Sequence, residues 1–128
     1  GSLKKEDDKI VLDSIEALDI AHLKDRFTSE LSDGEKQLVA IAKALAQQTG
    51  IIILDEPTAF LDYSNKTIVL DTLMRISKEM NKCIIMSTHD IDMSIDLGCS
   101  YLVVNKKEKK IQLVNAPVKK EELLALAF

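Results

Sequence analysis

Two short apolar runs constrain the fold of this chain more than any other feature. IIIL at residues 51–54 and CIIMS at residues 83–87 are rich in apolar β-formers and carry no charge. Runs of this kind are typical of strands that helices cover on both faces. Between them, Asp62 and Ser64 are suited to cap one long helix, whose buried stripe is Val69, Leu73, Ile76 and Met80. The strand–helix–strand order indicates a right-handed α/β unit with a largely parallel sheet.

The residues before the first run predict two helices. Apolar side chains recur at helical spacing over residues 7–18. Ser32 followed three residues later by Glu35 is a capping-box pattern, so a second helix is predicted to start at Asp33. Thr49 and Gly50 are expected to stop it.

The residues after the second run predict a short helix at 91–97, a hairpin of YLVV and IQLV joined by a Lys-rich turn, and a final helix after Pro117. Cys83 and Cys99 lie in apolar segments without metal-ligand spacing. We therefore interpret both as small core residues in a reducing compartment.

The composition fits one globular domain. The chain has 128 residues, a net charge of −4 and a pI near 5.2, with 46% apolar residues. An acidic balance argues against a nucleic-acid partner, because phosphate binding favours a basic face. No apolar run reaches the roughly 18 residues of a membrane-crossing helix, so we expect no membrane insertion by the chain itself.

Ionisable side chains follow both predicted strands. Asp55 and Glu56 come directly after the first strand, and His89 follows the second. Taken singly, Asp55 has a structural explanation as a turn residue and His89 as a loop-orienting residue. Because ligands collect beyond the carboxyl ends of parallel strands, the three together favour a functional site. However, no G-x-x-x-x-G-K-[ST] phosphate loop occurs in the sequence.

Four motifs in order resemble the carboxyl-terminal portion of an ATP-binding cassette (ABC) ATPase. LSDGEKQ is similar to the LSGGQ signature, IIILDEP to the Walker B strand, TAFLD to the D-loop and STHD to the switch-histidine loop. The resemblance implies a truncated P-loop NTPase-like α/β fold without the Walker A strand and loop. Residues 3–49 would belong to the helical subdomain with the signature, and residues 50–128 to the second half of the mainly parallel sheet core. Gly1 and Ser2 are interpreted as a cloning remnant.

The resemblance also implies the cofactors ATP and Mg²⁺ and a role for each strand-end residue. Asp55 would hold Mg²⁺, in part through water, since this ion keeps several waters. Glu56 would polarise the attacking water, as a general base near the metal. His89 would contact the γ-phosphate and sense its presence.

The signature residues would act on a nucleotide held by a second ABC ATPase subunit in a head-to-tail dimer. The Ser32 hydroxyl and the Gly34 amide would bind its γ-phosphate, and Asp62 would couple the two sites. Asp33 and Glu35 stand where the family has glycine and glutamine, which brings two carboxylates to a phosphate-facing surface. The capping box accounts for Glu35, whereas Asp33 adds repulsion toward phosphate.

The leading function is the ATP-hydrolysing subunit of an importer, bound through a membrane permease to the cytoplasmic face of the cell membrane. DEPTAFLDYSN, STHDIDMSIDLG and NAPVKKEELL are similar to importers of iron chelates, haem and cobalamin. The alternatives are a soluble ABC ATPase of translation or DNA repair, and a non-catalytic interaction module. The fragment alone is expected to be inactive. Without the Walker A strand between the CIIMS and YLVV strands, we expect either direct pairing of these two strands or self-association through strand edges.

Overall fold

The computed structural model describes residues 2–128, with side chains from Lys4 onward. The chain divides into two units, the first extending to Ser87 and the second comprising Thr88–Phe128. Each unit combines helices with a small sheet, which confirms the α/β class. Of the two residues interpreted as a cloning remnant, Gly1 lies outside the described residues and Ser2 begins the first helix.

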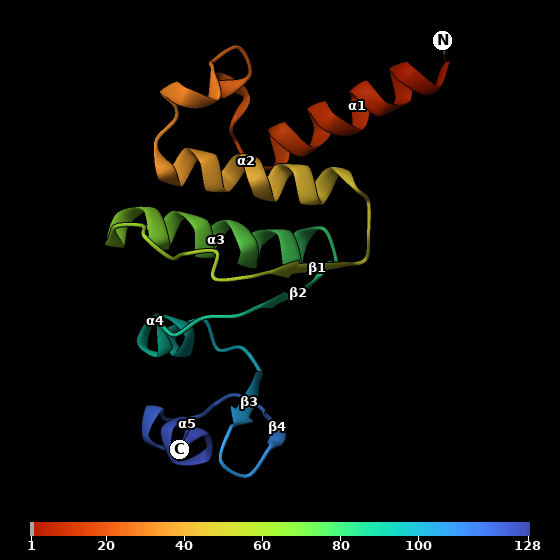
Figure 1. Cartoon of the computed structure of the whole chain (residues 1–128). Helices are drawn as coiled ribbons and strands as arrows, with labels where there is room; N and C mark the ends of the chain where they lie inside the picture. Colours follow the sequence, from red (N-terminus) through yellow and green to blue (C-terminus); the bar gives the residue numbers. More distant parts are fainter. Residues whose placement is uncertain (1) are drawn as a thin grey trace. The chain divides into compact units, whose positions relative to one another are not determined.

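The first unit places the starts of its two main helices next to each other. In chain order it consists of α1 (Ser2–Ala17), 3-10 turns at Ala21–Leu23 and Thr28–Glu30, α2 (Asp33–Ala46), β1 (Ile51–Leu54), α3 (Tyr63–Glu79) and β2 (Cys83–Met86). α1 and α3 both contact α2, and α2 and α3 lie side by side with their first turns at the same end (Figure 1). Ile41 of α2 packs in one core with Val69 and Ile76 of α3, and all three are almost completely buried.

Side-chain caps explain where these two helices begin. The Ser32 hydroxyl accepts a hydrogen bond from the Glu35 backbone N–H at 3.2 Å, and the Glu35 carboxylate accepts one from the Ser32 N–H at 2.7 Å. This capping box confirms the predicted start of α2 at Asp33. Asp62 caps α3 by accepting from the Asn65 N–H at 2.9 Å, whereas Ser64 lies inside the helix.

The β1–β2 pair is parallel, with Ile51 opposite Cys83 and Leu54 opposite Met86. Only one face of this pair packs on the core, with Ile52 buried and Leu54, Ile84 and Met86 partly buried. The other face is open, because Ile53 keeps 75% of its surface exposed and Cys83 is also exposed. The prediction of strands covered on both faces is therefore wrong for this chain, and so is the prediction that Cys83 is a core residue.

The second unit contains α4 (Ile91–Asp96), the antiparallel strands β3 (Tyr101–Asn105) and β4 (Lys110–Val114), and α5 (Lys120–Ala127). The hairpin and the final helix are confirmed, and the Lys-rich run forms the hairpin turn. Cys99 is only partly buried here. Among the described residues, β2 pairs only with β1 and β3 only with β4, so the direct pairing of the CIIMS and YLVV strands is not observed.

Helix bounds depart from the predictions at the start of α1 and at the ends of α2 and α3. α1 begins at Ser2 instead of Asp7, because Lys and Glu are good helix formers even without an apolar stripe. α2 ends at Ala46, before the predicted stop, and Met80 lies after α3 and is exposed instead of buried. Within residues 2–128, no helix combines the length and apolarity that a membrane crossing requires.

Candidate functional site

The two acids after β1 are held by a hydroxyl from the end of β2. The Ser87 hydroxyl donates a hydrogen bond to the Asp55 carboxylate at 2.6 Å and accepts one from the Glu56 backbone N–H at 2.9 Å. The Ser87 N–H in turn donates to the Leu54 carbonyl at 3.0 Å, which extends the parallel ladder by one step. Ser87 therefore fixes the direction in which the chain leaves β1.

Ser87 was not predicted as a site residue. Its signal is present in the register: Leu54 lies opposite Met86, so the next positions along the two strands are Asp55 and Ser87. A hydroxyl one step beyond a strand, opposite an acid in the same position, can orient that acid by a short, charge-assisted hydrogen bond.

Glu56 adopts a backbone conformation that is rare for its residue type. Its φ of 47° lies in the left-handed region, where a non-glycine residue is disfavoured sterically. The Ala59 N–H donates to the Glu56 carbonyl at 3.0 Å, and Pro57 and Thr58 of the same turn are buried. The turn thus holds Glu56 in a costly conformation, and such residues concentrate at functional sites.

The two carboxylates of the first α2 turn each have a cationic neighbour. The Lys36 Nζ lies 3.3 Å from the Asp33 carboxylate, and the Arg26 guanidinium lies 3.3 Å from the Glu35 carboxylate. Arg26 also donates to the Glu30 carbonyl at 2.7 Å, which fixes its position over the turn. The repulsion toward phosphate that Asp33 was expected to add is therefore partly compensated by Lys36.

Hydrogen bonds lower the pKa of Glu35. The largest cause is the hydrogen bond from the backbone N–H of Ser32; burial opposes it as the second cause, and the Ser32 hydroxyl and the positive charge of Arg26 lower the pKa further. A lowered pKa in the folded state means that the ionised carboxylate stabilises the fold. This contribution is present above the ordinary pKa of 4.5 and is lost as the pH falls through the lower, folded-state pKa.

We therefore expect Glu35→Gln to make the stability of the complete protein less dependent on pH in the acid range. At pH 7 the variant should unfold at a lower urea concentration than wild type, and this difference should shrink as the pH falls below 4.5. Urea unfolding at several pH values measures it, with Glu79→Gln at the exposed end of α3 as the control. A difference between wild type and Glu35→Gln that is constant with pH would contradict this account.

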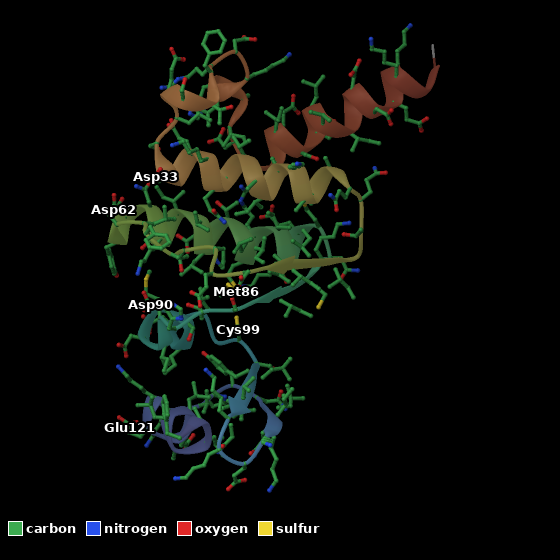
Figure 2. The ribbon with its side chains drawn as sticks, viewed as in Figure 1. Asp33, Asp62, Met86, Asp90, Cys99 and Glu121 are labelled. Atoms are coloured by element: carbon green, nitrogen blue, oxygen red, sulfur yellow. The ribbon has the colours of Figure 1, made fainter. Side chains whose placement is uncertain are left out.

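Ser32, Asp33 and Asp62 come together at the neighbouring starts of α2 and α3, where Figure 2 labels Asp33 and Asp62. They line a surface hollow of about 340 Å³ together with Leu31, Phe60, Leu61 and Asn65. Gly34 is buried beside it, and Ser32 is exposed to it. Both helices direct their backbone N–H ends toward this region, which favours anions.

His89 belongs to the second unit, where it is exposed and directly precedes Asp90. Asp90 caps α4, because its carboxylate accepts from the Met93 N–H at 3.4 Å and its own N–H donates to the Thr88 hydroxyl at 3.0 Å. The convergence of His89 with Asp55 and Glu56 stays a prediction. Within residues 2–128, no group of three or more His, Cys, Asp or Glu side chains is arranged to hold a metal ion.

Comparison with known proteins identifies the family. Residues 3–59 match the family described as ABC transporter. An uncharacterised ABC transporter ATP-binding protein of Haemophilus influenzae is 40% identical over 104 residues, which are 81% of this chain and 39% of that protein. A probable siderophore transport system ATP-binding protein, YusV of Bacillus subtilis, is 36% identical over 115 residues, covering 88% of this chain and 40% of that protein.

Comparison with a solved structure indicates the same family. An inward-facing structure of a putative metal-chelate type ABC transporter superposes with a TM-score of 0.82 at 30% identity, covering 92% of this chain and 47% of that chain. The chain belongs to the ABC transporter family, within its ATP-binding domain, and it spans less than half the length of these relatives.

Proposed function

We propose that this chain supplies the catalytic carboxylates and the signature turn of an ATP-hydrolysing subunit that powers import through a membrane permease. The observation that carries the proposal is the Asp55–Glu56 pair, held by Ser87 at the end of a parallel strand. Residues 3–49 would belong to the helical subdomain and residues 50–128 to the catalytic core. The complete protein would lie at the cytoplasmic face of the membrane through its permease.

The chemistry of the donor set fits Mg²⁺ with ATP. Asp55 is an exposed carboxylate with a hydroxyl beside it, and Mg²⁺ takes oxygen ligands while keeping several waters. When bound, the ion neutralises charge on the phosphates. Asp55 would hold it, and Ser87 would orient the Asp55 carboxylate.

Glu56 would accept the proton of the attacking water. The turn after β1 places it one residue beyond the metal-holding carboxylate, which keeps it near the metal without making it a ligand. Its left-handed backbone conformation supports this role, because strain is retained where the surrounding structure needs a particular geometry. His89 would contact the γ-phosphate.

The hollow between α2 and α3 would face the nucleotide of a second ABC ATPase subunit. The Ser32 hydroxyl and Gly34 amide would bind its γ-phosphate, with Asp33, Glu35 and Asp62 around them. Phe60 and Tyr63 support a partner at this surface: Phe60 is completely exposed at a φ of 64°, and Tyr63 is 77% exposed. Exposed apolar side chains that form a contiguous patch are typical of contact surfaces, and these two lie close together in sequence at the start of α3.

The substrate we propose is a metal chelate, such as an iron siderophore, haem or cobalamin. The siderophore-transport relative and the metal-chelate type structural neighbour support this class. A soluble ABC ATPase of translation or DNA repair is the alternative, but both of these relatives are named as transport proteins. The chain taken alone would be inactive and would self-associate through β1 and β2, each of which pairs on one side only within the described residues.

The proposal is tested by Ser87→Ala in the complete protein. Loss of a hydrogen bond to a charged carboxylate is worth about 1.5–3 kcal/mol, so we expect ATP turnover to fall by roughly tenfold or more. Steady-state phosphate release measures this effect. Cys83→Ser, at the exposed start of β2, is the matched control and should keep wild-type turnover. Absence of ATP hydrolysis by the wild-type complete protein would overturn the proposed function.

A further inference from the structure

Asn65 touches both halves of the hollow at the starts of α2 and α3. Its side-chain amide donates to the Asp62 carboxylate at 2.9 Å, and its backbone N–H donates to the other Asp62 oxygen, also at 2.9 Å. The same amide lies against Gly34: a Cβ added to Gly34 would come 2.5 Å from the Asn65 Oδ1 and 3.2 Å from its Cβ. Asn65 therefore fills the space between Asp62 and the first turn of α2.

This contact gives a physical reason for glycine at position 34. Gly34 is helical and needs no left-handed backbone conformation, and alanine is favoured over glycine in a helix by about 1 kcal/mol. The amide of Asn65 cannot simply swing away from a new methyl group without losing its bond to Asp62. The absence of a side chain at Gly34 thus serves the close approach of Asn65.

We infer that Asn65 is a positioning residue that locks the loop carrying Asp62 to the turn carrying Ser32 and Gly34. The two segments come from different helices and are separated by a long stretch of sequence. With Asn65 in place, a displacement of Asp62 is transmitted to the Ser32 hydroxyl and the Gly34 amide. This inference rests on the proposed function, in which those groups bind the nucleotide of the partner subunit.

A double-mutant cycle in the complete protein tests whether Asn65 and Gly34 act together. Gly34→Ala keeps the backbone amide but pushes on Asn65, and Asn65→Ala removes the group that is pushed. We expect Gly34→Ala to lower kcat for ATP by about tenfold and Asn65→Ala by about fivefold, with the double variant no worse than Asn65→Ala alone. If the two substitutions acted independently, the double variant would lose about fiftyfold in kcat.

Further measurements separate positioning from damage to the fold. Binding of a fluorescent ATP analogue to the single subunit should keep its wild-type Kd in all three variants, because in the proposed dimer Asn65 would lie near the partner's nucleotide and not near the subunit's own. Ser64→Ala, exposed on the same turn of α3, is the control and should leave kcat unchanged. Multiplicative kcat effects, or a weakened Kd that accounts for the loss, would overturn the inference.

The urea midpoints of the same variants keep the inference testable if the proposed function fails. If the wild-type protein hydrolyses no ATP, non-additive midpoints still support the contact between Gly34 and Asn65, whereas additive midpoints refute it. Multiplicative kcat effects in an active protein with non-additive midpoints would refute the positioning role while leaving the proposed function intact.

Discussion

The complete protein carrying Glu56→Gln should hydrolyse ATP at least about a hundredfold more slowly than wild type, since a general base contributes a factor of this order or more. Glutamine keeps the shape of the side chain, so the turn after β1 and the Ser87 bond to the Glu56 backbone N–H should remain. Nucleotide binding should therefore be retained. Phosphate release and the binding of a fluorescent ATP analogue measure the two quantities separately.

Two variants sharpen this prediction. His89→Ala should also abolish most turnover, because His89 would contact the γ-phosphate. Cys83→Ser should keep nearly full turnover, because Cys83 lies on the open face of β2 at the end away from Ser87. Near wild-type turnover in Glu56→Gln would show that another group is the base.

The 128-residue chain by itself should show no ATP turnover. The Lys and backbone amides of a phosphate loop supply most of the β- and γ-phosphate binding in P-loop ATPases, and the sequence has no G-x-x-x-x-G-K-[ST] motif. Phosphate release by the purified chain at millimolar Mg-ATP measures this. Turnover that disappears with Glu56→Gln would refute the prediction, since it would then come from this site and not from a contaminant.

Local signals predicted the parts of the fold that depend on neighbouring residues. The starts of α2 and α3 follow from the caps made by Ser32 and Asp62, each of which acts on a backbone N–H three residues away. The strands IIIL and CIIM follow from composition, and their parallel pairing follows from the helix between them. Acids at a strand end could therefore be assigned to a candidate site from the sequence alone.

Features that depend on distant residues could not be predicted in this way. Ile53 and Cys83 are apolar in sequence, yet their face of the sheet is open, and an apolar run carries no information about what covers it. Ser87 lies opposite Asp55 because of the register between β1 and β2, and the Asn65 side chain packs against Gly34 on another helix. Serine and asparagine are common at exposed positions, so their residue types alone do not indicate a functional role.

The most direct test of the account is the mass of the complete Glu56→Gln protein with and without Mg-ATP. Because this variant should bind ATP without consuming it, the nucleotide should hold two subunits together through Ser32 and Gly34 of the partner. Light scattering should show the mass of a single subunit without nucleotide and a doubled mass with Mg-ATP. Adding Ser32→Arg should prevent the doubling while leaving ATP binding to the single subunit intact. A mass that ATP does not change, or a doubling that persists with Ser32→Arg, would contradict the account.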